Sequence, residues 1–172
     1  MIYLIKGVIK MKKRVIIDPN AIAYLKNVSS EMKALIEFVE DVETYYETDP
    51  FTALVSQVFF QLISFKAATT IWERFLDNYG PITPESILSL SFDELRTVGL
   101  TKSKTAYIRN IANAFKNNEI NTNWKDMNDE EVINEVTKIK GIGEWTGQMF
   151  LVFCLNRPNV LSYGDIALRK GI

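Results

Sequence analysis

The chain has 172 residues, with 20 lysines and arginines against 21 aspartates and glutamates, no histidine and one cysteine. The absence of histidine excludes Ser-His and Cys-His catalytic dyads and an imidazole general base. Cys154 alone cannot form an intrachain disulfide, a cysteine-rich zinc site or a four-cysteine iron–sulfur cluster. The net charge of −1 gives no overall electrostatic argument for nucleic-acid binding. Acid–base chemistry must therefore come from carboxylates, lysines, tyrosines or water.

The length suits one domain, or two small lobes that share a core, and 47% hydrophobic residues are enough to bury that core. No apolar run approaches the roughly 18 residues that span a bilayer, and the N-terminus lacks the small-residue cleavage site of a signal peptide. We therefore expect a soluble, cytoplasmic protein without a membrane partner. Met11 is an alternative translation start to Met1.

The N-terminal segment, residues 1–48, contains a β-branched run at 14–17 that fits a short strand, followed by a breaker at 18–20. From Ala21 to Glu40 the apolar residues recur at helical spacing, which predicts one or two short helices. Residues 31–49 carry seven acids and a single lysine. Such a run is typical of a solvated face, and it would repel phosphates.

The central segment, residues 49–125, is expected to be a helical lobe. Asp49 suits an N-cap and Pro50 a first helical turn. The apolar stripe of the helix that they start consists of Leu54, Val55, Val58, Phe59, Leu62 and Ile63. Helix continues or resumes from residue 66 to a Gly80-Pro81 stop, and short helices start at Thr83 and at a Ser91–Glu94 capping box. Residues 103–117 form a basic helix, whose cations are Lys102, Lys104, Arg109 and Lys116.

The third segment, residues 126–172, begins with a second capping-box pattern at Asn128–Glu131. The amphipathic helix that follows leads into Gly141-Ile142-Gly143, and a further helix starts at Glu144. Two glycines allow a tight turn and a close approach to a ligand, and the free N–H groups of the next helix offer an anion site flanked by Lys138 and Lys140. An ordinary glycine-rich corner between two helices is the alternative. The predicted class is all-α.

The segment Val136–Gly147 resembles the helix–hairpin–helix of DNA base-excision glycosylases. From Asp49 to Ile172 the chain is similar to the bacterial and archaeal 3-methyladenine DNA glycosylase II branch of that superfamily. The motifs that carry this resemblance are Asp49-Pro-Phe-x-Ala-Leu-Val, Gln61-Leu-Ile-Ser64, Leu90-Ser-Phe-Asp-Glu-Leu-Arg-x-Val-Gly-Leu100, Ile108-Arg-Asn-Ile-Ala112, the hairpin and Gly164-Asp165-Ile-Ala-Leu-Arg-Lys-Gly171.

The resemblance implies a single glycosylase domain over residues 1–172, with two helical lobes and the active site in the cleft between them. It implies double-stranded DNA with alkylated bases as the partner, no obligatory protein partner and no cofactor. Members of the family continue with a C-terminal helix that carries pocket aromatics, so the chain is expected to be cut short at Ile172.

The resemblance gives Asp165 the catalytic role, since it follows Trp145 at the family's spacing of 20 residues. A carboxylate beside the sugar would stabilise an oxocarbenium-like cation and help to orient water. The alternative for Asp165 is a helix N-cap. Trp145 stands where glycosylases with AP-lyase activity carry a Schiff-base lysine, which implies a monofunctional enzyme. Trp145, Met149 and Tyr163 would line the base pocket, although Ser162-Tyr163 replaces the family's Pro-apolar pair.

The resemblance also implies DNA contacts. Leu62 would wedge into the duplex as the nucleotide flips out, although its spacing alone makes it a core residue. Phe60 departs from the small residue that is common in the family. The other DNA-contacting residues would be Gln61, Ser64, Lys140, Gly141, Ile142, Gly143 and Thr146. A monovalent cation, bound by the backbone carbonyls of Thr137, Ile139 and Gly141, is part of the same expectation.

Two functions of different class follow. The first is a monofunctional DNA N-glycosylase that flips out 3-methyladenine-like bases, hydrolyses their N-glycosidic bonds and initiates base excision repair. The second is a non-catalytic helix–hairpin–helix DNA-binding module derived from such an enzyme. A helical protein–protein adaptor is a third reading, which would require the hairpin to be a simple corner.

Overall fold

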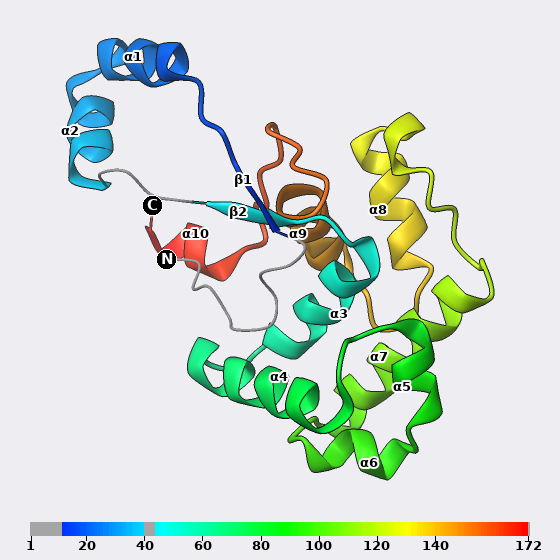
Figure 1. Cartoon of the computed structure of the whole chain (residues 1–172). Coiled ribbons are helices and arrows are strands. Elements are labelled where there is room, and N and C mark those ends of the chain that lie inside the picture. Colours follow the sequence, from blue (N-terminus) through cyan, green and yellow to red (C-terminus); the bar gives the residue numbers. More distant parts are fainter. Residues whose placement is uncertain (1–11, 40–43, 172) are drawn as a thin grey trace.

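The computed structural model describes residues 12–39 and 44–171, and its elements are helices apart from one small sheet (Figure 1). Both alternative start positions lie outside the described residues. The helices are α1 (Pro19–Val28), α2 (Ser30–Val39), α3 (Pro50–Phe60), α4 (Phe65–Tyr79), α5 (Pro84–Ser89), α6 (Phe92–Thr97), α7 (Lys102–Lys116), α8 (Asp129–Thr137), α9 (Glu144–Phe153), α10 (Ile166–Gly171) and the 3-10 turn η2 (Trp124–Asp126). None of these helices is long and apolar enough to cross a membrane.

The sheet pairs β1 (Lys12–Arg14) with β2 (Tyr45–Glu47) in antiparallel register. The predicted strand at 14–17 is therefore shifted toward the N-terminus, and β2 was hidden in the acidic run. Glu47 in that run is buried, and its carboxylate accepts the N–H groups of Thr48 and Asp49. The prediction of a fully solvated acidic face is wrong at this residue, because its side chain is needed to shape the turn into α3.

Several helices start where the sequence predicts, but the predicted breaker at 18–20 is wrong: α1 begins at Pro19, because the Asp18 carboxylate caps it by accepting the Asn20 N–H. Asp49 caps α3 by accepting the Thr52 N–H at 2.9 Å, with Pro50 in the first turn. Reciprocal capping boxes start α6, through Ser91 and Glu94, and α8, through Asn128 and Glu131. These caps depend on residues three positions apart, so the local sequence is enough to specify them.

Helix α3 lies at the centre of the molecule, between α4 and α7 on one side and α9 on the other (Figure 1). Six of its eleven residues are buried. Phe59 packs edge-on against Trp72 and Phe75 of α4, with ring centroids 5.0 and 6.2 Å away. The burial of these rings and of the aliphatic side chains of α7, α8 and α9 supplies the main stabilising term for this core.

The predicted basic helix is real, but its central cations do not face solvent. Lys104 is buried and its ammonium donates to the Phe59 carbonyl at the end of α3, at 2.8 Å. Arg109 donates to the carbonyl of Leu90, which caps the C-terminal end of α5. Burial also lowers the pKa of Lys104. These two cations bind helix-end carbonyls, so two of the four cations of the predicted basic helix serve the fold.

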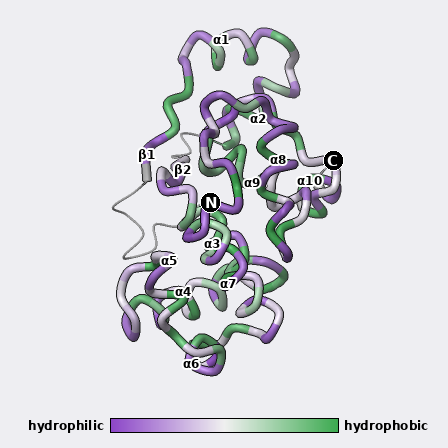
Figure 2. Tube along the Cα trace, turned by 90° about the vertical axis from the view of Figure 1, so that its right-hand side faces the viewer, coloured by the Kyte–Doolittle hydropathy of each residue, from purple (hydrophilic) through white to green (hydrophobic). Residues whose placement is uncertain are grey.

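Helices α1 and α2 pack on each other, and no residue of either is buried. Figures 1 and 2 show this pair at the opposite end of the molecule from α6. The two helices confirm the expectation of short helices between Ala21 and Glu40. The core of the described residues is therefore built from α3 onward, together with the small sheet that contacts α3 and α9.

Candidate active site

The hairpin between α8 and α9 is anchored by its isoleucines. Ile139 and Ile142 are both buried, and the Ile142 N–H donates to the Ile139 carbonyl at 3.0 Å. Gly141 has φ +106°, and a Cβ placed on it would lie 2.1 Å from Cδ1 of Tyr107 on α7. Glycine is thus required there for two reasons, backbone conformation and space. Ile142 was predicted to contact DNA, yet both its side chain and its N–H are engaged within the protein.

The N-terminus of α9 remains open as an anion site. Its N-cap is Gly143, which has no side chain to cap the first turn, and a Cβ at this glycine would meet nothing within 4 Å. The N–H groups of Glu144 and Trp145 have no carbonyl one turn earlier in the helix to bind. N–H groups of this kind, together with the positive end of the helix dipole, suit a phosphate oxygen.

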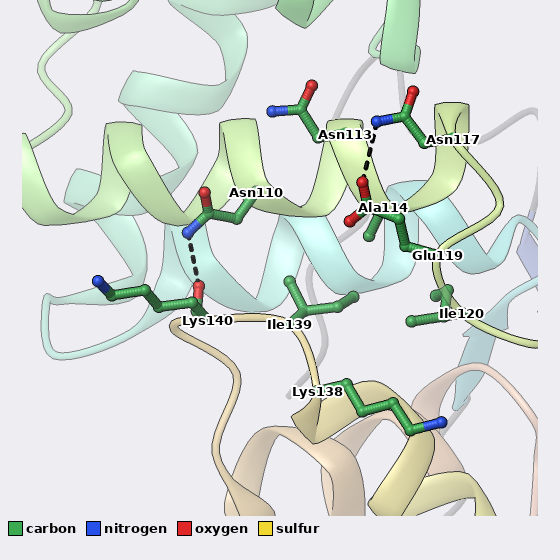
Figure 3. Close-up of a pocket in the computed structure, with 9 residues that line it drawn as sticks. All are labelled: Asn110, Asn113, Ala114, Asn117, Glu119, Ile120, Lys138, Ile139 and Lys140. Carbon is green, nitrogen blue, oxygen red and sulfur yellow. Dashed lines mark hydrogen bonds between the residues drawn. The ribbon is translucent and has the colours of Figure 1, made fainter.

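The two lysines of the hairpin have different surroundings. Lys138 forms an ion pair of 2.6 Å with Glu135, and this hydrogen bond lowers the pKa of the Glu135 carboxyl. Lys140 is exposed, and its side chain extends away from that of Lys138 (Figure 3). Glu135 therefore partly offsets the charge of Lys138, and we assign the predicted flanking charge of the anion site mainly to Lys140.

A cavity of about 500 Å³ lies between the C-terminal half of α7 and the hairpin (Figure 3). Its lining is Asn110, Asn113, Ala114, Asn117, Glu119, Ile120, Lys138, Ile139 and Lys140. The Asn110 amide donates to the Lys140 carbonyl at 2.9 Å and so fastens the hairpin to α7. The sequence did not suggest this role for Asn110, because the two residues are 30 positions apart. The predicted catalytic and base-pocket residues lie outside this lining.

Trp145 and Asp165 meet directly, although 20 residues separate them. The indole N–H of Trp145 donates to Oδ2 of Asp165 at 2.8 Å. The other carboxylate oxygen, Oδ1, accepts the Leu168 N–H at 3.0 Å and so caps the start of α10. The two readings of Asp165, as an N-cap and as a carboxylate of the site, are therefore compatible. The Trp145 and Leu168 N–H groups thus help to fix the orientation of this carboxylate.

The other predicted pocket residues are less closely gathered. Trp145 is 37% exposed, so one part of its ring is available to a ligand. Met149 lies one helical turn further along α9 and is half-buried. Tyr163 is 83% exposed, so it forms no packed floor beneath the carboxylate. Ser162 beside it is buried, and its hydroxyl has no hydrogen-bond partner among the described residues.

The turn between α3 and α4, residues 61–64, is called the wedge turn below. Helix α3 ends at Phe60, so Leu62 and Ile63 leave the predicted apolar stripe. Leu62 is fully exposed, at 101%, and its φ is +56°. The interpretation of Leu62 as a core residue is wrong, because the Ser64 side chain caps α4 and breaks the helix before the stripe can continue.

Gln61 and Thr146 were both predicted to contact DNA, and the structure bonds them to each other. The Gln61 amide donates to the Thr146 hydroxyl at 3.0 Å, and Thr146 is only 2% exposed. Ser64 accepts the Ala67 N–H as the N-cap of α4. In this structure the polar side chains of the wedge turn thus serve the protein itself, and Leu62 is the side chain that projects from it.

The described residues offer neither a reactive cysteine nor a side-chain metal site. Cys154 is buried, and burial together with Glu47 and Asp49 raises the pKa of its thiol to about 12, so it is no thiolate nucleophile near neutral pH. No cluster of three acidic or cysteine side chains that could hold a metal occurs in residues 12–39 and 44–171. The predicted monovalent cation would use backbone carbonyls, of which that of Ile139 accepts one N–H and keeps a second lone pair.

Residues 55–172 match the family model described as HhH-GPD superfamily base excision DNA repair protein. DNA-3-methyladenine glycosylase 1 of Schizosaccharomyces pombe is 32% identical over 156 residues, which cover 86% of this chain and 68% of that protein. The DNA-3-methyladenine glycosylase of Saccharomyces cerevisiae is 34% identical over 166 residues, which cover 90% of this chain and 54% of that protein. The chain thus spans 68% and 54% of the lengths of these two relatives.

Solved structures that resemble this chain include proteins of the same kind as its sequence relatives. The S. pombe 3-methyladenine DNA glycosylase in complex with abasic DNA superposes with a TM-score of 0.78 at 32% identity, covering 88% of this chain and 78% of that one. A DNA-3-methyladenine glycosidase from Bacillus halodurans gives a TM-score of 0.74 at 33% identity, covering 90% and 72%. The arrangement of helices around α3 and the hairpin is therefore shared with these proteins.

Proposed function

The chain belongs to the HhH-GPD superfamily of base excision DNA repair proteins, and we propose that it is a DNA N-glycosylase that removes alkylated bases of the 3-methyladenine type. The names of its sequence relatives and the DNA-bound structural neighbour support this substrate class. The predicted helix–hairpin–helix glycosylase fold is confirmed by the family match and the superpositions. The observation that carries the proposal is the Asp165 carboxylate held by Trp145 at the open start of α9.

The chemistry asked of this carboxylate is modest. An alkylated purine carries positive charge and is a good leaving group, so bond cleavage leaves an oxocarbenium-like sugar. Asp165 would stabilise that cation and orient the attacking water, because its orientation is already fixed by two donors. The exposed part of the Trp145 ring would stack on the cationic base, which favours an electron-rich aromatic.

Trp145 also sets the expected reaction type. An indole cannot form a Schiff base with the sugar, so the proposed enzyme releases the base by hydrolysis and leaves the DNA backbone intact. Borohydride reduction during turnover should therefore trap no covalent protein–DNA adduct. A trapped adduct would contradict the monofunctional reaction.

The proposed DNA contacts are made by exposed groups of the wedge turn and of the hairpin. Leu62 projects from the wedge turn and can enter the base stack that the flipped nucleotide leaves. The N–H groups at the start of α9, with Lys140 nearby, would bind a backbone phosphate. The predicted placement of the site in a cleft between two lobes stays a prediction.

Base release from methylated duplex DNA tests the proposal. Asp165→Asn removes the charge but keeps the size and one acceptor, so α10 stays capped while cation stabilisation is lost. We expect release to fall by about 100-fold or more. Asp93→Asn on the distant helix α6 is the matched control and should leave release unchanged. Release equal to background from both the wild type and Asp165→Asn would favour a non-catalytic DNA-binding module instead.

A further inference from the structure

The wedge turn is fastened to the start of α9 by one side-chain hydrogen bond. Gln61, the last residue before Leu62, donates its amide to the hydroxyl of Thr146 at 3.0 Å. The acceptor is buried, so it could not exchange this partner for bulk water without a local opening. The bond therefore fixes the distance between two elements that are 85 residues apart in the sequence.

The backbone of the wedge turn needs such a restraint. Leu62 has φ +56°, a left-handed conformation that costs a residue with a side chain about 1–2 kcal/mol. Strain of this kind persists where neighbouring contacts hold the backbone in place. The flanks of the turn are held by Lys104, which binds the Phe59 carbonyl, and by the Ser64 cap of α4. Gln61 adds the restraint that reaches α9.

The residue before Thr146 connects the Gln61–Thr146 hydrogen bond to the proposed active site. Trp145, the preceding residue, donates its indole N–H to Asp165. Two consecutive residues in the first turn of α9 are therefore bonded to the wedge turn and to the catalytic carboxylate. This helical turn therefore links the wedge turn to Asp165 through two side-chain hydrogen bonds, in addition to the packing of α3 on α9.

We infer that Gln61 and Thr146 are positioning residues that hold the wedge at the place where its insertion delivers the flipped base to Asp165. This inference rests on the proposed glycosylase function and extends it. It assigns the Gln61 amide to the protein rather than to DNA. Loss of the bond should slow base extrusion from a paired duplex, and it should spare bond cleavage once the base is already unpaired.

Single-turnover base release from two duplexes separates these steps. One duplex carries the alkylated purine in a normal pair, and the other carries it opposite an abasic site, where extrusion costs less. The variants are Gln61→Leu, Thr146→Val, their combination, and Thr146→Ser, which keeps the hydroxyl. Thr70→Val on α4 is the matched control, since that hydroxyl donates only to the Lys66 carbonyl one turn before it.

We expect Gln61→Leu and Thr146→Val to be about threefold to tenfold slower on the paired duplex, the range for one neutral hydrogen bond. Both should remain within about twofold of wild type on the unpaired duplex. The double variant should be no slower than the slower single variant, because both remove the same bond. Thr146→Ser should restore most of the rate.

Other outcomes overturn the inference. Equal slowing on both duplexes would give the two residues a role in chemistry or in folding, and additive effects in the double variant would mean that they act separately. Unchanged rates on the paired duplex would show that the bond does not position the wedge. A wild-type protein that releases no base from either duplex overturns the proposed function itself, together with this inference.

Discussion

The wedge turn, residues 61–64, and the hairpin turn, residues 138–143, are both expected to face DNA, and they are built in opposite ways. The hairpin turn points its apolar side chains inward: Ile142 is 5% exposed, and Gly141 lies against the Tyr107 ring. The wedge turn points Leu62 outward and keeps it in a left-handed conformation that glycine would tolerate better.

Because one turn is buried and the other is exposed, their side chains should contribute differently to stability and to activity. The hairpin turn is part of the core, so its shape and the stability of the fold depend on the same contacts. The wedge turn exposes Leu62 with Ile63 and Phe65 close by, a small apolar surface that contributes little to folding. Changes to the packed residues of the hairpin turn, Gly141 and Ile142, should therefore be seen first in unfolding measurements, and changes to the exposed Leu62 of the wedge turn first in activity.

Gly141→Ala should give the largest effect. The new Cβ would overlap the Tyr107 ring, and alanine disfavours φ +106°. We expect the free energy of unfolding to fall by about 3–4 kcal/mol, measured by urea denaturation. Gly143→Ala is the control, since a Cβ there meets nothing, and its cost should stay below about 1 kcal/mol. Equal losses in the two variants would show that the ring does not dictate the turn.

Ile142→Ala and Leu62→Ala compare the same kind of truncation in the two turns. Ile142→Ala removes a buried side chain and should lower the free energy of unfolding by about 2–4 kcal/mol. Leu62→Ala should change it by less than about 0.5 kcal/mol, because that side chain touches solvent. Base release from paired duplex DNA should nevertheless fall in Leu62→Ala, by about tenfold. A stability loss in Leu62→Ala like that in Ile142→Ala would remove the distinction.

One lysine lies beside each turn, Lys104 at the wedge turn and Lys140 in the hairpin turn. Replacing each by methionine should affect stability in the first case and DNA binding in the second. Lys104→Met takes a charged donor from the Phe59 carbonyl and should destabilise the protein by about 1–3 kcal/mol. Lys140→Met should leave stability within about 0.5 kcal/mol. Its effect should appear in DNA binding, where the slope of log K against log salt should drop by about one. An unchanged salt slope would mean that Lys140 makes no phosphate contact.

Leu62→Gly should give the smallest effect, and with the opposite sign. Glycine relieves the left-handed strain but enlarges the unfolded ensemble, so the free energy of unfolding should rise by only a few tenths to about 1 kcal/mol. Thermal unfolding would measure this gain, and base release from paired DNA would fall in the same variant. A loss of stability would show that the Leu62 side chain contributes to folding.

The elements that the sequence predicts well depend on close neighbours along the chain. The caps at Asp49, Ser91 and Asn128 and the start of α9 were all predictable, because each depends on residues within one turn. The end of α3 was not, since the apolar spacing continues through Leu62. The break between α3 and α4 is marked by the N-cap at Ser64, and the spacing of the apolar residues gives no sign of it.

The candidate site divides in the same way. Asp165, Trp145 and the glycines were identified from their motifs, and the structure joins the first two by a hydrogen bond of 2.8 Å. The partners of Gln61 and Lys104 could not be predicted, because Thr146 and Phe59 are 85 and 45 residues away. A polar or charged side chain looks available for DNA in a sequence, whereas the folded chain has already bonded it to its own backbone or to another side chain.

By itself the sequence determined the helical class, the caps, the glycine hairpin and the aspartate that follows it, since short-range patterns specify each of these. It also excluded histidine and disulfide chemistry by composition alone. Only the tertiary structure decided which cations remain exposed, that Leu62 projects while Ile142 is buried, and that Trp145 and Thr146 join the carboxylate to the wedge turn. Those outcomes depend on which distant segments meet around α3. A polar side chain that is buried there must form its hydrogen bonds within the protein, so it is not available to bind DNA.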